Sequence, residues 1–392
     1  MKINRPRFTP WTIALVCLTF ILSVSSFTAC EEQEKIIKIG SQASYTGDGS
    51  EYGYDQLNSL MIAAQELSPV EIGGFEYKIS IIPKDDEGNV EKSFLISQEL
   101  VDEDVAAVVG STFNGTTKAA IPNYAEFDIP LLSPSAQSVD IALGTNNFFR
   151  MIINNKQKIE NIAFFLKDEI DPESLVLIDN REEYSINLID FLIEVFDDIG
   201  FEYLKRYSIQ AGKEDMEVMA ENLFIDNPDT IFFCAGPKDL ADLMSNTREL
   251  GLESTFITEQ MGMAGDISIF AEEEDIEGLV AIVYQPPSLA RYSEDESAIA
   301  FWQKYMDYLE ESDPEGGLTG PGEYAPYSYD ALNVIIEAMK KANSIIPAEF
   351  IDELRDTSYE GTTGLVSFDS NGDRQDPEST VFVMKNNNWV RY

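Results

Sequence analysis

Apolar runs alternate with amphipathic helical patterns through the first half of the chain. Leu57, Leu60 and Ala64 fall on one face of a helix expected over residues 55–67, which is the spacing of an α-helix that covers a core. The other elements expected here are strands at 36–40, 77–82, 105–109 and 129–132, a helix at 90–101 and a helix that begins near Thr116. This alternation predicts a parallel sheet with helices on both faces.

The same pattern restarts in the second half of the chain. A helix is expected over residues 185–199, ended by Gly200 as a C-cap. The strands expected around it are residues 174–178, 230–235, 255–258 and 278–284, followed by helices at 298–309 and 329–342 and a β-rich end at 364–392. The fold class that we predict is therefore α/β, with two open parallel-sheet lobes of Rossmann-like plan.

The first 29 residues have the layout of an export signal. Lys2, Arg5 and Arg7 precede an apolar stretch over residues 11–27, as in secretory signals. Phe27-Thr28-Ala29-Cys30 resembles a bacterial lipobox, so we expect cleavage before Cys30, a lipid on this cysteine and a short tether over residues 30–35. An uncleaved membrane anchor remains an alternative, because the apolar stretch is close to the shortest length that spans a bilayer.

Histidine is absent from the whole sequence, and cysteine is rare. The absence of histidine removes the commonest general base and the commonest transition-metal ligand. With Cys17 in the signal and Cys30 lipidated, Cys234 is left alone in an apolar run, where we expect a buried small side chain. We therefore predict no catalytic residues, no metal site, no cofactor and no enzyme activity.

The formal charge of −43, from 70 acidic and 27 basic residues, excludes partners that need clustered Lys and Arg. Nucleic acid and anionic lipid surfaces are such partners, so we expect contact with a membrane only through the lipid at Cys30. The acidity has two open explanations: a saline environment that screens self-repulsion, or an acidic surface without special meaning.

Five motifs resemble, in their order and spacing, the branched-chain amino-acid-binding family of type I periplasmic solute-binding proteins. They are Ile37-Lys38-Ile39-Gly40 with Tyr52-Gly53, Asp85-Asp86, residues 108–117, residues 129–136 and residues 364–374. The resemblance implies two lobes, with the chain crossing between them near Ile152, Tyr284 and Gly364. The expected N-terminal lobe is 36–152 plus 285–363, and the expected C-terminal lobe is 153–284 plus 364–392.

In that family, donors from the loops after the third and fourth strands hold the carboxylate of the ligand. The residues that match these loops here are Asn114, Gly115, Thr116, Thr117, Ser135, Ala136 and Gln137. Helix N-terminal N–H groups and hydroxyls suit a carboxylate, although Thr116 can equally be a helix cap. Asn114 and Gln137 depart from the family's usual Ser and Thr, which puts aliphatic amino-acid specificity in doubt.

Three further residues match ligand positions of the family. Glu259 corresponds to the acid that pairs with the ligand's α-amino group, and the alternative is a solvated loop acid. Tyr52 and Tyr184 correspond to aromatic walls from opposite lobes, with ordinary core packing as the alternative. A further aromatic position of the family falls on Gly236, which would leave the pocket roomier there.

The resemblance implies a solute-binding lipoprotein that closes around an amino acid or related small molecule and delivers it to an ABC transporter permease. Both lobes must then contact the ligand, because only differential affinity for the closed state drives closure. We expect an exported monomer anchored by lipid at Cys30. The alternatives are a ligand-sensing domain for a signalling partner and, disfavoured by the missing histidine, an enzyme on the same fold.

Overall fold

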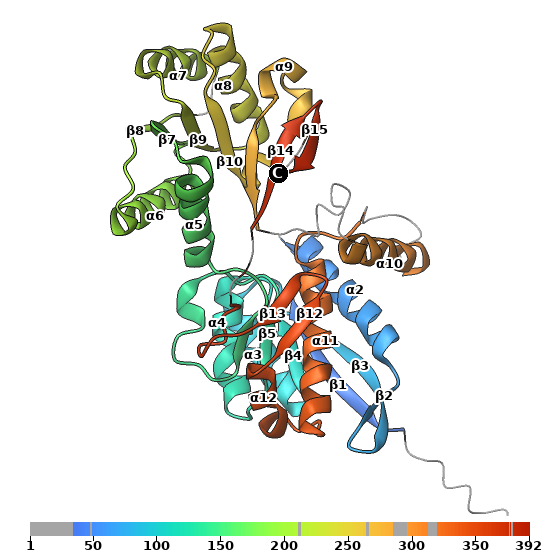
Figure 1. Ribbon diagram of the computed structural model, residues 1–392. Helices are drawn as coiled ribbons and strands as arrows, with labels where there is room; N and C mark the ends of the chain where they lie inside the picture. The colour runs from blue at the N-terminus through green and yellow to red at the C-terminus, as the bar shows by residue number, and fades with distance from the viewer. Residues whose placement is uncertain are drawn as a thin grey trace, which may run out of the picture.

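The structure is a computed structural model in which the chain folds into two lobes joined by a waist (Figure 1). It describes residues 34–47, 49–210, 213–263, 266–284, 296–312, 320–375, 377 and 379–392. The expected signal and the expected lipid site at Cys30 lie outside the described residues. Within the described residues, no helix is both long and apolar enough to cross a membrane.

The sheet of the N-terminal lobe has six strands in the order β2-β3-β1-β4-β5-β6. Only the β2–β3 pair is antiparallel. Strands β4 and β5 are buried along their whole length, as expected for central strands with helices on both faces. The strands are β1 (Ile36–Ala43), β2 (Val70–Ile72), β3 (Phe75–Asp85), β4 (Ala107–Gly110), β5 (Leu131–Ser133) and β6 (Phe148–Arg150).

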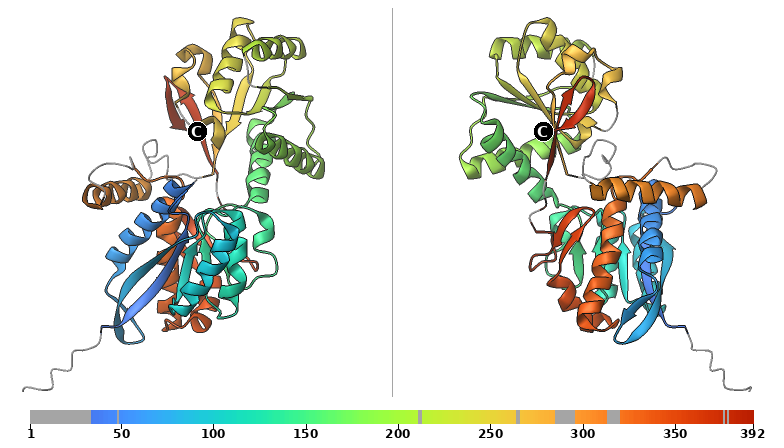
Figure 2. Two further views of the ribbon diagram at one scale, coloured as in Figure 1. Left: turned by 180° about the vertical axis from the view of Figure 1, so that it is seen from behind. Right: turned by 45° about the vertical axis from the view of Figure 1, so that its right-hand side comes forward.

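Helices from distant parts of the chain cover this sheet. Helix α11 (Ala325–Ala342) lies beside α2 (Ser50–Leu67), as Figure 2 shows, and both contribute to the same core cluster. Helices α3 (Val90–Asp102) and α4 (Asn114–Ala125) pack together on a second, smaller core. The remaining elements on this lobe are α10 (Glu296–Ser312), α12 (Pro347–Arg355) and the hairpin of β12 (Ser358–Gly361) and β13 (Gly364–Ser367).

The sheet of the C-terminal lobe has seven strands in the order β15-β14-β11-β10-β9-β7-β8. Its last two strands, β14 (Thr380–Lys385) and β15 (Asn388–Arg391), run antiparallel at one edge. The others are β7 (Leu175–Asp179), β8 (Lys205–Ser208), β9 (Thr230–Cys234), β10 (Thr255–Glu259) and β11 (Val280–Val283). Its helices are α5 (Asn155–Phe164), α6 (Glu183–Ile199), α7 (Lys213–Asp226), α8 (Pro237–Glu249) and the short α9 (Glu273–Ile276).

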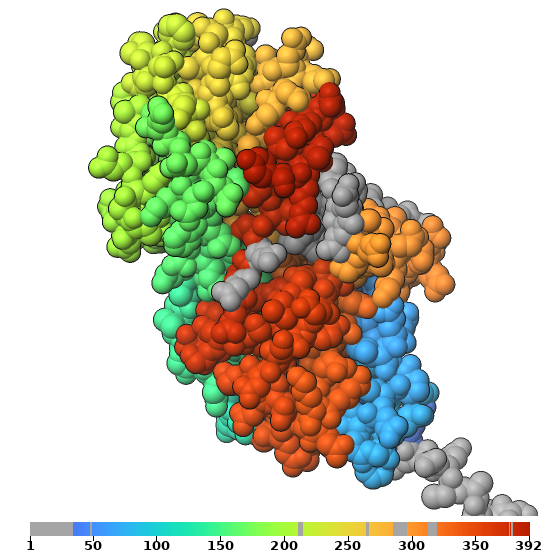
Figure 3. Space-filling view, viewed as in Figure 1, coloured from blue at the N-terminus to red at the C-terminus, as the bar shows by residue number. Residues whose placement is uncertain are grey.

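The two lobes exchange the chain at the waist. The first exchange lies between β6 and α5, around Ile152, and the second follows β11 and Tyr284. We expected the third at Gly364, but β13 begins there and pairs with β12. The chain joins the seven-stranded sheet only at Thr380, so the expected boundary at 364 is too early. In Figure 3 the orange-red segment covers the lower lobe, and the red C-terminal strands lie on the upper lobe.

The predicted fold class is confirmed, and most expected elements are present with shifted ends. Gly200 ends α6 in the left-handed region, with φ of 65°, where a glycine has no steric penalty. The acidic run after β13 is a turn, in which Gly372 N donates to Asp369 O at 3.0 Å. One core cluster runs through the waist from Ile37 in β1 to Leu177 in β7, so the lobes share apolar packing at the hinge.

Candidate functional site

The carboxyl ends of β1, β4 and β5 lie at one edge of the N-terminal sheet, where loops of parallel sheets gather. Phe113 stands at this edge with its side chain partly exposed. Gly49 and Gly88 lie close to its ring, because a Cβ at either position would come within 3 Å of a ring carbon. The edge is therefore tightly packed around an aromatic side chain that sequence reasoning missed.

The hydroxyls expected to bind a ligand in the first loop are used within the loop. Thr116 Oγ1 accepts from Phe113 N at 3.2 Å and donates to Phe113 O at 3.0 Å. Thr117 Oγ1 donates to Ser111 O at 3.2 Å and to Phe113 O at 2.8 Å. Gly115 is exposed in the first turn of α4. The contacts of Thr116 are therefore those of a residue that caps its helix, which is the alternative considered from the sequence.

The second loop is tied to the first. Ser135 Oγ donates to Thr112 O at 2.8 Å, and Ala136 N donates to Ser133 Oγ at 3.0 Å. Asn114 Oδ1 accepts from Gln137 N at 2.8 Å and from Ser138 N at 3.1 Å. Within the described part of the chain, the side-chain NH₂ groups of Asn114 and Gln137 have no protein partner. These two amides are thus side-chain donors that the loops offer to a ligand.

Arg150 fixes the position of the second loop, and the sequence patterns gave no indication of this role. Its side chain is fully buried and donates to Ala136 O and, at 2.9 Å, to Ser138 O. Its Nε lies 2.7 Å from Asp373 Oδ1, and Asn154 Nδ2 donates to Asp373 Oδ2 at 3.0 Å. The guanidinium therefore joins the loop to the turn after β13, since its planar fork can serve several acceptors at once.

On the C-terminal lobe, Glu259 at the end of β10 lies in a closed polar cluster. It is 0% exposed. Its Oε2 lies 3.2 Å from Lys158 Nζ and accepts from the Tyr184 hydroxyl at 3.0 Å. The alternative of a solvated loop acid is therefore wrong, because the carboxylate is buried and paired with a lysine from α5.

Lys158 is the second residue that sequence reasoning missed. Its Nζ donates to the Tyr184 hydroxyl and lies 5.0 Å and 4.8 Å from the ring centroids of Tyr184 and Tyr284, distances suited to cation–π attraction. The signal was its spacing: Lys158 and Ile162 are four residues apart, which places both on the buried face of α5.

A second group of residues faces this cluster from the N-terminal lobe. The rings of Tyr52 and Tyr324 meet edge to face with centroids 5.4 Å apart. Glu323 accepts from Gln260 Nε2 at 2.9 Å, a direct hydrogen bond between the lobes. Burial raises the pKa of Glu323, while a hydrogen bond from Tyr324 and the charge of Lys158 oppose the rise.

Electrostatics also link the two lobes through Tyr184. Burial raises its pKa above the usual value, and the nearby charge of Glu259 and the hydroxyl of Tyr324 add to the rise. Tyr184 nevertheless keeps 45% of its surface exposed. Of the predicted residues, Tyr184 and Glu259 are thus bonded to each other, and Tyr52 lies on the facing lobe beside Tyr324. Among the described residues, no hydrogen bond or ion pair joins the Asn114 and Ser135 loops to Glu259.

Two further expectations concern Cys234, the last residue of β9, and Gly236, which precedes α8 on the C-terminal lobe. Cys234 is buried, as expected, and its Sγ lies 3.9 Å from Glu259 Oε1. Burial raises the pKa of this thiol, and the charge of Glu259 adds to the rise, so the thiolate is disfavoured. A Cβ on Gly236 would meet no atom within 4 Å, which agrees with a roomier pocket on that side.

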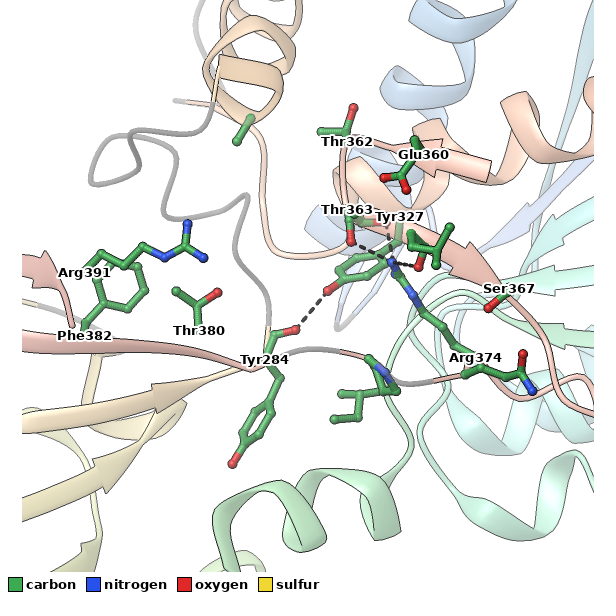
Figure 4. Close-up of a pocket in the computed structure, with 16 residues that line it drawn as sticks. Tyr284, Tyr327, Glu360, Thr362, Thr363, Ser367, Arg374, Thr380, Phe382 and Arg391 are labelled. Carbon is green, nitrogen blue, oxygen red and sulfur yellow. Dashed lines mark hydrogen bonds between the residues drawn. The ribbon is translucent and has the colours of Figure 1, made fainter. Parts of the chain in front are cut away.

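A separate cavity of about 430 Å³ lies at the hinge (Figure 4). Arg374 donates there to Met151 O at 2.9 Å and to Thr363 O at 2.6 Å. The hydroxyl of Tyr327 donates to Tyr284 O at 3.0 Å. None of the predicted ligand residues lines this cavity. Its contacts therefore hold the crossing segments together. No group of three or more Cys, Asp or Glu suited to a metal ion occurs among the described residues.

Comparison with protein families decides the affiliation. Residues 36–388 match the model of a family described as "Periplasmic binding protein". The chain belongs to this family. As a periplasmic binding protein it has the two-lobed architecture and hinge crossings described above, and the resemblance noted in the sequence is confirmed.

Named relatives of this periplasmic binding protein bind small solutes. The leucine-, isoleucine-, valine-, threonine- and alanine-binding protein of Pseudomonas aeruginosa is 21% identical over 364 residues, 92% of this chain and 93% of that protein. An ABC transporter substrate-binding protein from Desulfitobacterium hafniense, solved with Leu, has a TM-score of 0.66 at 22% identity and covers 91% of this chain and 100% of its own.

A third similar structure holds a ligand of another chemical class. It is the solute-binding protein of an ABC transporter from Rhodopseudomonas palustris BisB5 in complex with 3,4-dihydroxy benzoic acid. Its TM-score is 0.65 at 19% identity, with 92% of this chain and 97% of that chain covered. At such identities the similarity establishes the fold of the periplasmic binding protein and leaves its ligand open.

Proposed function

We propose that this protein captures a small organic solute in the gap between its lobes and delivers it to an ABC transporter permease. In this proposal it is exported, anchored through a lipid on Cys30, monomeric and without enzymatic activity. The solute is an amino acid, as for the Pseudomonas relative, or a related organic acid, as for the Rhodopseudomonas structure. Closure of the lobes around the solute would produce the form that the permease recognises.

The proposal is supported by a contact between the lobes: Gln260, which follows Glu259, donates to Glu323, which precedes Tyr324. Tyr52 stands on α2 beside Tyr324, and Tyr184 stands on α6 beside Glu259. Aromatic walls from two lobes give a flat solute a large contact area at low entropic cost. Because each lobe supplies part of that area, the solute gains its full contact only in the closed form.

A ligand panel tests the proposal. Thermal unfolding of the full chain without its signal would be followed with amino acids, aromatic acids and aliphatic acids, each at 1 mM. A bound solute at about 100 times its Kd stabilises the native state by about 2.7 kcal/mol, so the true ligand class should raise Tm by several degrees. Unchanged concentrations of each compound after incubation would separate binding from turnover.

A pair of tyrosine variants locates the binding. Tyr52→Ala should reduce affinity at least tenfold, because it removes one wall of the gap. Tyr54→Ala is the matched control, since Tyr54 lies on the same helix with its side chain 45% exposed. Equal losses in both variants, or no loss in either, would contradict binding in the gap.

The sensory alternative uses the same gap and differs in the partner. Pull-down of the liganded protein with its cognate permease subunits, compared with a receptor kinase ectodomain, distinguishes the two. Binding to the permease only in the presence of ligand supports transport.

A further inference from the structure

The carboxylate of Glu259 has no position left for a ligand. Its Oε1 accepts from Met261 N at 3.0 Å and lies 3.9 Å from Cys234 Sγ. Its Oε2 receives the two contacts from Tyr184 and Lys158 described above. A carboxylate offers about four acceptor directions, and four protein groups occupy them. A ligand ammonium could bind Glu259 only by displacing one of these groups.

Lys158 occupies the place in which a ligand ammonium would be expected. Its side chain is 10% exposed, and its Nζ is held by the Tyr184 hydroxyl and the Glu259 carboxylate between two aromatic rings. These are the partners that an ammonium group seeks: a carboxylate, a hydroxyl and π-faces. A second ammonium next to Lys158 would meet like-charge repulsion in a partly dry site, where repulsion is screened only weakly.

The remaining acid at the gap lies on the other lobe and is also engaged. Glu323 accepts from Gln260 and faces the charge of Lys158 across the gap. Glu323 is therefore an alternative site for an ammonium group, on the N-terminal lobe.

We propose that Lys158 is a resident cation that determines specificity, and that the solute is an organic acid without an ammonium group. This inference rests on the proposed function and narrows its ligand class. In this proposal the body of the solute lies between Tyr52 and Tyr184. When the lobes close, the solute carboxylate accepts hydrogen bonds from the side-chain NH₂ groups of Asn114 and Gln137.

Matched pairs of compounds test the inference in the wild-type protein. Leucine would be compared with 4-methylpentanoic acid, and phenylalanine with 3-phenylpropanoic acid, by titration calorimetry; each pair differs only in the amino group. We expect at least one deaminated acid to bind tenfold or more tightly than its amino partner. Tighter or equal binding of the amino partner in every pair that binds would overturn the inference.

Variants of two lysines on α5 test whether Lys158 causes the preference for acids without an amino group. Lys158→Met frees Glu259 for an ammonium and should shift the affinity ratio of each pair at least tenfold toward the amino acid. Lys156→Met is the control, because Lys156 is exposed and pairs with Glu160 one turn away; it should keep the wild-type ratio. The same shift in both variants would overturn the role of Lys158.

The experiments also distinguish failure of this inference from failure of the proposed function. If the wild type prefers the amino partner and Glu323→Gln removes that preference, Glu323 is the ammonium site and the inference is wrong. If no compound of any class binds the wild type or the variants, the proposed function itself fails, and the inference fails with it. The wild-type comparison remains decisive even if Lys158→Met does not fold.

Discussion

Two buried ion pairs lie close together in the sequence, and they differ in what surrounds them. Arg150 pairs with Asp373 and also binds two backbone carbonyls, so its guanidinium joins three chain segments at the hinge. Lys158 pairs with Glu259 and also contacts Tyr184, whose side chain is 45% exposed. The first pair joins segments of the hinge, whereas the second is the pair that we propose determines the charge met by a solute.

The largest effect should come from breaking the hinge pair. Arg150→Met leaves Asp373 and two carbonyls without their partner, and loss of one member of a buried pair costs about 3–5 kcal/mol. Urea unfolding would measure the difference. Lys118→Met, which breaks an exposed pair with Asp140, should cost less than about 1 kcal/mol. Similar losses in the two variants would show that burial does not distinguish these pairs.

Asp55 is a buried acid for which no ion pair occurs among the described residues, so it can be compared with the two paired acids, Asp373 and Glu259. Burial raises the pKa of Asp55 to about 6, although hydrogen bonds from Tyr305 and Gly322 N oppose the rise. The folded state therefore keeps a proton that the unfolded chain loses near pH 4, so this contribution to stability is full below pH 4 and is lost as the pH rises through about 6.

The variant Asp55→Asn should remove this pH dependence. Relative to the variant, the wild type should lose about 2.4 kcal/mol between pH 4 and pH 7. Denaturant midpoints of both proteins across this range provide the measurement. A constant difference between the two proteins would mean that Asp55 titrates normally.

A smaller loss is expected at the gap. Lys158→Met should cost about 2 kcal/mol, because Glu259 keeps its bonds from Tyr184 and Met261 N and loses one charged partner. The double variant Lys158→Met with Glu259→Gln leaves no unpaired charge and should recover part of that loss. A double variant less stable than Lys158→Met would show that Glu259 is stabilised mainly by other groups.

The smallest effect is expected at Gly236. Its φ of −70° and ψ of 166° suit any residue, and a Cβ there meets open space. Gly236→Ala at the N-cap of α8 should cost no more than about 1 kcal/mol, because alanine is a poorer N-cap than glycine but meets no clash here. A larger loss, measured by thermal unfolding, would mean that the region beside Gly236 is already filled.

The fold was largely predictable because its signals are local. Buried runs such as residues 107–110 and 131–133 must be central strands when helices cover both faces. The third crossing was misplaced because Gly364 opens a hairpin instead of a crossing strand. The hairpin with β12 is local, but the path of the chain after it depends on the contact of Arg374 with Met151, which is far away in the sequence.

The site was predictable only as a set of positions. Alignment by motif predicted Tyr52, Tyr184 and Glu259; the structure shows Tyr184 bonded to Glu259, and Tyr52 packed on Tyr324 of the other lobe. The alignment left open whether the Thr116 hydroxyl binds a ligand or caps its helix, and it could not show that Lys158 pairs with Glu259. That pairing arises from side chains that meet only after the C-terminal lobe has folded.

Each lobe combines segments that are far apart in the sequence. This connectivity determines how the protein would respond to cleavage of its chain. Helix α11 shares a core with α2, and β14 pairs with β11 to complete the upper sheet. A nick between β11 and α10 would therefore yield two peptides, neither of which contains an intact lobe. Because the severed parts interlock through buried surfaces, the nicked protein should remain associated and separate only when it is denatured.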